Sequence, residues 1–142
     1  MKIAIGCDHA GFELKTEIIK ALKAENHEFT NYGTDGPESV DYPDFAHPVC
    51  SDVETQKADL GILICGSANG MAMSANKHET IRCALSWLPE IAKLGRQHNN
   101  ANVVAIPARF VSTKVGIEIA KAFIYADFEG GRHQKRVDKI VC

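Results

Sequence analysis

Cys65 is the side chain in this sequence that is best placed to act as a base or a nucleophile. It ends the apolar run Leu60–Ile64 and precedes the turn Gly66–Gly70. If a helix begins near Ala68 or Asn69, its free N–H groups and the positive end of its dipole face the thiol, and this placement lowers a thiol pKa. The ordinary alternative is a buried cysteine that packs as a small apolar side chain, and position alone slightly favours it.

The turn that follows Cys65, with the sequence Gly-Ser-Ala-Asn-Gly, is a candidate anion site. Successive backbone N–H groups at the start of a helix form a nest that suits a phosphate or an enediolate oxygen. The turn matches neither the dinucleotide-binding fingerprint nor the Walker loop. The alternative interpretation is an ordinary strand-to-helix turn that Ser67 or Asn69 caps.

Charged and titratable side chains supply a second set of candidates. Asp8 and His9 follow the first apolar run, where Asp8 either caps the next helix or contacts sugar hydroxyls and His9 contacts a phosphate. Arg132 and Arg136 lie four residues apart, hence on one face of a helix, and two guanidinium groups clamp a phosphate dianion well. Arg109 would add a third cation, although a solvated basic face is the ordinary alternative.

His98 ends an amphipathic helical pattern, where it is either a helix C-cap or a general acid/base near neutral pH. The remaining histidines are assigned to surface or supporting positions. No pair of Cys or His residues has the usual spacing of zinc ligands, so we expect no metal site. A thiol base, an anion nest, an imidazole and a basic clamp together suit aldose–ketose isomerisation of a sugar phosphate, in which negative charge develops on an enediolate.

Apolar runs that alternate with helical patterns predict the elements that position these residues. The expected strands are Lys2–Gly6, Glu28–Asn31, Leu60–Cys65, Arg82–Ser86 and Val103–Ile106. The expected helices are Phe12–Ala24, Asp44–Gln56, Met71–Asn76, Pro89–Gln97 and Thr113–Tyr125. This alternation predicts an α/β fold with a parallel sheet and helices on both faces. Ligands of such sheets bind beyond the carboxyl ends of the strands, which selects the segments after the first, third and fifth strands.

Length and composition narrow the class of protein. The 142 residues suit one domain, spanning 1–142, and the net charge of −2 argues against broad nucleic-acid binding. No apolar run approaches a membrane span, and the apolar N-terminal stretch is too short for a signal peptide. Five cysteines without a CxxC motif indicate free thiols in a reducing compartment, so we expect a cytoplasmic protein.

Six short motifs, taken in order, resemble the sugar-phosphate isomerase family of ribose-5-phosphate isomerase B. The family also includes allose-6-phosphate isomerase and the subunits of galactose-6-phosphate isomerase. The motifs are Gly6–Phe12, Asp41–Pro43, Ile64–Ser67, Ala75–Lys77, Arg96–Asn99 and Glu129–Gln134. The resemblance implies a three-layer α/β/α Rossmann-like sandwich around a five-stranded parallel sheet in the order 2-1-3-5-4. It also implies metal-free catalysis by a homodimer, or a homotetramer of paired dimers, with each active site shared between subunits.

The resemblance also implies a role for each matching residue. Cys65 is the base, Ser67 shuttles a proton between the substrate oxygens, and Asp8 and His98 open the furanose ring. The backbone of the turn that comprises Gly66, Ser67, Ala68, Asn69 and Gly70 holds the enediolate. The phosphate and the rest of the sugar are bound by His9, Arg132, Arg136, Arg109, Tyr42 and Asn99. Two residues depart from the family pattern: Ala68 replaces a glycine, and Asn100 replaces an aspartate.

We therefore expect interconversion of D-ribose 5-phosphate and D-ribulose 5-phosphate without a cofactor. An isomerase of a six-carbon aldose 6-phosphate is the close alternative, since the motifs barely separate these substrates. A phosphosugar-binding module without catalysis is the alternative of another class, although binding alone has no need of a reactive thiol. A nucleotide-binding oxidoreductase is disfavoured because the first turn lacks the required glycines.

Overall fold

The computed structural model describes residues 1–141, and its centre is a parallel sheet in the order β2-β1-β3-β5-β4. The strands within this range are β1 (Lys2–Cys7), β2 (Glu28–Asn31), β3 (Leu60–Cys65), β4 (Cys83–Leu85) and β5 (Val103–Pro107). The predicted fold class and strand order are both confirmed. The expected edge strand at Arg82–Ser86 is shorter than predicted, since the N–H of Arg82 donates to the Asn102 side chain rather than to a neighbouring strand.

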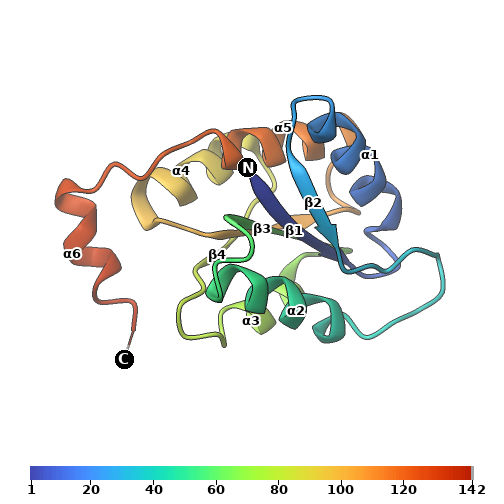
Figure 1. Cartoon of the computed structure of the whole chain (residues 1–142), viewed down its shortest axis with the longest axis horizontal. Helices are drawn as coiled ribbons and strands as arrows, with labels where there is room; N and C mark the ends of the chain where they lie inside the picture. The colour runs from blue at the N-terminus through green and yellow to red at the C-terminus, as the bar shows by residue number, and fades with distance from the viewer. Residues whose placement is uncertain (142) are drawn as a thin grey trace.

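Helices cover both faces of the sheet (Figure 1). They are α1 (Phe12–Lys23), α2 (Pro43–Glu54), α3 (Asn69–Ala75), α4 (Pro89–Asn99) and α5 (Thr113–Ile124). Helices α1, α4 and α5 pack on one face around a core that includes Ile18, Ile62 and Phe123. Helices α2 and α3 pack on the other face around Val49 and Met71. Two apolar layers thus enclose the sheet, which explains why its central strands consist of uninterrupted apolar residues.

The register of the sheet brings three predicted site segments to one edge. Strand β3 pairs with β1 on one side and with β5 on the other, and Cys65 lies opposite Pro107 in the last rung. The chain continues from β1 into Asp8 and from β5 into Arg109. Because parallel strands end at the same edge, Asp8, Cys65 and Arg109 emerge side by side.

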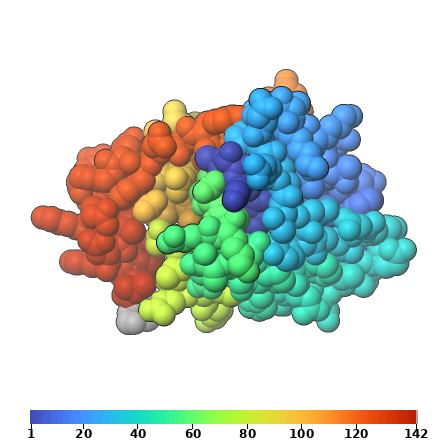
Figure 2. Space-filling view, viewed as in Figure 1, coloured from blue at the N-terminus to red at the C-terminus, as the bar shows by residue number. Residues whose placement is uncertain are grey.

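The C-terminal segment leaves this body. After α5 the chain runs across the molecule to a short 3-10 helix η1 (Gly131–His133) and helix α6 (Gln134–Val137). Figure 1 shows α6 projecting at the end of the molecule opposite β2, and Figure 2 shows the same segment as a lobe at that end. We call residues 129–141 the C-terminal arm. Along residues 1–141, the chain forms no helix of the length and hydropathy that crossing a bilayer requires.

Candidate active site

A cavity of about 380 Å³ opens at the carboxyl edge of β1, β3 and β5. Its lining residues are Asp8, Tyr42, Cys65, Gly66, Ser67, Gly70, Arg109 and Phe110. All but Phe110 belong to the predicted set, and Ala68 and Asn69 lie within the same turn. The structure thus places the predicted thiol, the turn that follows it and the predicted carboxylate around one space.

Asp8 is a buried carboxylate that the local backbone holds in place. Its Oδ1 accepts hydrogen bonds from the N–H groups of Ala10 at 2.9 Å and Gly11 at 3.2 Å. The N–H of Asp8 donates to the carbonyl of Ile64, which ties the end of β1 to β3. Asp8 therefore orders the turn before α1, which agrees with the prediction that it caps this helix. It also faces the cavity, where it could contact a sugar hydroxyl as the alternative prediction requires.

The turn between Cys65 and α3 reverses the chain through a left-handed residue. Ala68 has φ 65° and ψ −11°, directly before the first residue of α3. This conformation suits glycine, so an alanine here costs about 1 kcal/mol. The other departure from the family pattern is easily accommodated: Asn100 also has a positive φ, of 48°, at the end of α4, and asparagine tolerates that conformation.

Burial dominates the ionisation of Cys65. Its side chain is only 5% exposed, and burial raises the pKa of the thiol above its ordinary value. The N–H groups of Met71, Ala68 and Ser67 lower this pKa, and the nearby Asp8 carboxylate raises it. The helix begins at Asn69, two residues before its predicted start at Met71, so its first N–H groups are close to the thiol as the placement argument requires. Desolvation nevertheless outweighs these N–H groups, and the pKa rises instead of falling.

This ionisation state predicts how Cys65 reacts with iodoacetamide. Only the thiolate is alkylated, so the rate of modification should rise about tenfold for each pH unit between pH 7 and pH 9. The measurement is mass spectrometry of the peptide that carries Cys65, with Cys65→Ala as the control that loses the label. A rate that levels off below pH 8 would show that the thiol pKa is lowered instead.

Tyr42 packs directly against the start of α3. A Cβ atom on Gly70 would lie 2.5 Å from Cζ of the Tyr42 ring, so only glycine allows this contact. Tyr42 immediately precedes helix α2, and its own carbonyl accepts from the N–H groups of Phe45 and Ala46. The backbone of Tyr42 is thereby held at the start of α2, and the residue, which is 40% exposed, forms one wall of the cavity.

The loop that leads to Tyr42 is anchored by a buried lysine on α1. Lys15 is 1% exposed, and its Nζ donates to Asp35 Oδ1 at 2.6 Å, the Thr34 carbonyl at 2.7 Å and Asn31 Oδ1 at 3.0 Å. The hydrogen bond from Lys15, followed in weight by that from Asn31, lowers the pKa of the Asp35 carboxyl. Lys15 therefore joins helix α1 to the first residues of the loop 33–42.

Replacing Lys15 with methionine keeps the aliphatic stem but removes these three hydrogen bonds. We expect Lys15→Met to lower the free energy of unfolding by about 1–3 kcal/mol, because three hydrogen bonds from one buried ammonium group are lost, one of them to the charged carboxylate of Asp35. Urea unfolding measures this change. Lys23→Met is the matched control on the same helix, since Lys23 is exposed, and it should change stability by less than about 0.5 kcal/mol. Equal effects of the two substitutions would contradict the anchoring role.

Besides Ala68 and Asn69 of the turn, five predicted residues do not line the cavity in the described part of this chain. They are His9, His98, Asn99, Arg132 and Arg136. His9 follows Asp8, and its Nδ1 is buried without a hydrogen-bond partner among residues 1–141. Asn99 lines a separate cavity of about 240 Å³ beside Ile140, while Arg132 and Arg136 are exposed on the C-terminal arm.

The sequence reasoning missed three residues. Phe110 lines the cavity and is 74% exposed, and its position just after Arg109 was the only signal for it. Glu129 and His133 surround His98, and their side chains come together only through the path of the arm. His133, assigned to the surface or a supporting position, is only 5% exposed.

Comparisons with known proteins agree with this geometry. The family model described as Ribose/Galactose Isomerase matches residues 3–140. Ribose-5-phosphate isomerase B of Escherichia coli (strain K12) is 44% identical over 141 residues, which cover 99% of this chain and 95% of that protein.

Two solved structures are similar over nearly their full length. The crystal structure of a ribose 5-phosphate isomerase from Thermotoga maritima has a TM-score of 0.96 at 43% identity, covering 99% of this chain and 97% of that one. Ribose-5-phosphate isomerase B from Mycoplasma genitalium, solved with bound ribulose-5-phosphate, has a TM-score of 0.93 at 43% identity. That likeness covers 98% of this chain and 93% of the other.

Proposed function

This chain belongs to the ribose/galactose isomerase family, and we propose that it interconverts D-ribose 5-phosphate and D-ribulose 5-phosphate with Cys65 as the base. The observation that carries the proposal is the cavity in which the Cys65 thiol, the Ser67 hydroxyl and the turn Gly66–Gly70 face one space. A thiol beside converging N–H groups suits a reaction that removes a carbon-bound proton and builds charge on oxygen.

The reaction proceeds through an enediolate. The Cys65 thiolate takes the proton from C2 of the open-chain aldose, and the electron pair moves so that negative charge develops on O1. The N–H groups of the turn stabilise that oxygen. A proton then passes from O2 to O1 through the Ser67 hydroxyl, and Cys65 returns its proton to C1. The product is the ketose, and no cofactor is consumed.

The raised pKa of Cys65 has a consequence for this step. The thiol is the dominant form at neutral pH, so the reactive base is a minor ionised species. The N–H groups of Ser67, Ala68 and Met71, which lower the pKa, favour that species. Once formed, a thiolate of raised pKa is a stronger base toward carbon than an ordinary one.

Binding and ring opening combine residues that line the cavity with residues that lie outside it. We assign furanose opening to Asp8 and His98, which exchange protons with the C1 hydroxyl and the ring oxygen. The phosphate dianion is held by His9, Arg132 and Arg136, with Arg109 beside them, and Tyr42 and Asn99 contact the sugar. Because Arg132 and Arg136 lie on the projecting arm, we place them over the cavity of a second subunit in a homodimer.

Two observations support the shared site. Among residues 1–141, the cavity around Cys65 is lined by none of the arm residues. Large apolar side chains also lie beside its mouth, with Phe110 74% and Trp87 50% exposed. A second subunit would cover these side chains while its arm completes the cavity.

The free thiols Cys7, Cys50, Cys65 and Cys83 fit a reducing compartment, and we place the enzyme in the cytoplasm.

A direct assay tests the function. Purified protein is given ribose 5-phosphate, allose 6-phosphate and galactose 6-phosphate, and kcat/KM is compared among them. We expect the five-carbon substrate to be preferred, and activity to survive EDTA. Preference for a six-carbon phosphate would overturn the substrate assignment. Binding of all three substrates with neither turnover nor exchange of the C2 hydrogen for deuterium from the solvent would overturn catalysis altogether.

A further inference from the structure

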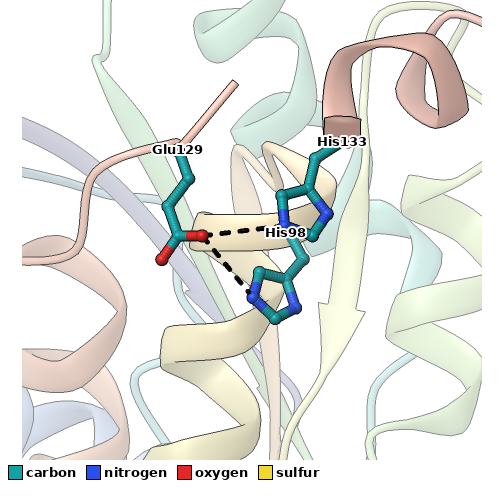
Figure 3. Close-up of side chains that lie close together, drawn as sticks. All are labelled: His98, Glu129 and His133. Atoms are coloured by element: carbon teal, nitrogen blue, oxygen red, sulfur yellow. Dashed lines mark ion pairs between the residues drawn. The ribbon is translucent and has the colours of Figure 1, made fainter. Parts of the chain in front are cut away.

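Three donor groups that can bind a metal meet where the C-terminal arm crosses helix α4. His98 lies near the end of α4, Glu129 follows α5, and His133 ends the helix η1. Glu129 Oε2 lies 3.8 Å from His98 Nε2 and 3.6 Å from His133 Nε2 (Figure 3). One donor atom from each of the three side chains lies within 4.8 Å of the other two. We call this set the arm cluster.

His133 supplies an independent indication that the cluster takes a ligand. The residue is 5% exposed, and its Nε2 is buried without a hydrogen-bond partner among residues 1–141. Buried polar atoms are almost always paired, so an unpaired nitrogen calls for a ligand. Figure 3 shows this nitrogen facing the same carboxylate oxygen as His98. The side chains of His98 and Glu129 are 37% and 48% exposed, which leaves a route from solvent.

The donor set matches a transition metal rather than a hard cation. Two imidazole nitrogens and one carboxylate with an open fourth position are the ligands of three-residue zinc sites, whereas Mg²⁺ and Ca²⁺ prefer oxygen ligands throughout. Zinc bonds of 2.0–2.1 Å at tetrahedral angles set donor atoms about 3.3 Å apart. The separations of 3.6 and 3.8 Å between Glu129 and the two histidines therefore need to close by a few tenths of an ångström. The two histidine donors, which lie within 4.8 Å of each other, come together only when a ring rotates.

Two features of the cluster work against ion binding and limit its affinity. The imidazoles of His98 and His133 are stacked, with centroids 4.2 Å apart and planes at 11°, so their in-plane lone pairs are almost parallel. One ring must rotate to share an ion, and the half-exposed His98 is free to do so. Arg132 and Arg136 also add positive charge next to His133 in the sequence.

We propose that His98, Glu129 and His133 bind a divalent transition-metal ion of the Zn²⁺ class, and that the occupied site inhibits the enzyme. The ion binds Nε2 of His98, fixes the ring and removes the proton that this nitrogen would exchange. The inhibitory part rests on the proposed function, in which His98 opens the sugar ring. The spacing of Cys and His in the sequence predicts no metal site, because these ligands come from segments separated by more than thirty residues.

Metal binding is tested on the full chain without substrate. Co²⁺ is the spectroscopic probe, and the expected signal is the visible absorption of a tetrahedral ion without the near-ultraviolet bands of cobalt–thiolate bonds. Zn²⁺ should displace it. Glu129→Gln should weaken Zn²⁺ binding by at least about tenfold, and His133→Phe, which keeps a flat ring against His98, by at least as much. Glu129 is exposed, so its variant remains informative if His133→Phe fails to fold.

The chain contains a matched control cluster. His47 Nδ1 lies 2.8 Å from His78 Nε2, and His78 Nδ1 lies 2.7 Å from Glu54 Oε2. This group also has two imidazoles and a carboxylate, but both His78 nitrogens already have partners. His78→Gln should leave Zn²⁺ affinity unchanged. Failure to bind Zn²⁺, thiolate bands with Co²⁺, or equal affinity in wild type and Glu129→Gln would each overturn the proposed site.

Inhibition is tested separately. Zn²⁺ should inhibit the isomerisation of ribose 5-phosphate by the wild-type enzyme, and EDTA should reverse the inhibition. With the activity of each protein expressed relative to its own metal-free rate, Glu129→Gln should need at least about tenfold more Zn²⁺ than the wild type for the same inhibition. Zn²⁺ binding at the cluster without loss of activity would overturn the inhibitory part. If the chain has no isomerase activity, the proposed function fails, while the Co²⁺ spectrum still tests the site.

Discussion

Replacing Cys65 with alanine should lower kcat for ribose 5-phosphate by about 10³–10⁴-fold, because Cys65 is the proposed base and Asp8, the carboxylate that shares its cavity, is already held by the N–H groups of Ala10 and Gly11. Exchange of the C2 hydrogen with solvent deuterium should fall by the same factor, since it reports the proton transfer itself. Cys65→Ser should be nearly as inactive, because an alcohol is far harder to ionise than a thiol. Steady-state kinetics and NMR measure the two effects.

A second buried cysteine provides the control. Cys50 lies in helix α2, is fully buried, and has a pKa that burial raises to about 12. Cys50→Ala removes a thiol from the core without touching the cavity, so it should change stability more than kcat. Cys65→Ala that keeps more than a tenth of wild-type turnover would refute the assigned role, and a comparable loss in Cys50→Ala would trace the effect to packing.

Mixing two impaired variants should restore activity if the arm of one subunit completes the cavity of the other. Arg132→Ala alone should lower kcat/KM by about tenfold to a hundredfold, the usual loss for one hydrogen bond to a charged group. Cys65→Ala alone is inactive. A mixed dimer of the two has one site with both residues intact. After random subunit exchange the mixture should reach about a quarter of wild-type activity, because half of the dimers are mixed and each has one working site.

The cavity lining provides the control for this experiment as well. Arg109 lines the same cavity as Cys65 in one chain, so Cys65→Ala mixed with Arg109→Ala yields no site with both residues intact. That mixture should not exceed the activity that Arg109→Ala contributes by itself. No recovery in the Arg132 mixture would place the arm residues on the cavity of their own chain, whereas recovery in the Arg109 mixture would place Arg109 on the cavity of the other chain.

The elements that carry the site follow from the sequence because its central strands are apolar throughout. The strand Leu60–Cys65 and the strand Glu28–Asn31 have the predicted bounds, and helix α1 ends one residue before its predicted end. Since parallel strands end at a common edge, this was enough to bring Asp8, Cys65 and Arg109 together. Strand order came from the family resemblance rather than from the residues.

Other features depend on the folded environment and could not be predicted. The direction of the Cys65 pKa shift depends on the balance between burial, which raises the pKa, and nearby N–H groups, which lower it. A predicted helix start indicates the N–H groups but not the degree of burial. The left-handed conformation of Ala68 follows from how the turn reverses; this residue itself gives no sign of it, and only the glycine of the family pattern points to a positive φ there. The meeting of His98 with His133 depends on the path of residues 126–133, which have no apolar periodicity to predict it.

The projecting arm has a consequence for the kinetics of dilute enzyme. If each working site combines the Cys65 of one chain with the arm of another, rate is proportional to the number of pairs rather than chains. Well below the dissociation constant of the dimer, pairs form in proportion to the square of chain concentration. Turnover then becomes second order in enzyme, and a tenfold dilution removes about ninety-nine hundredths of the rate instead of nine tenths.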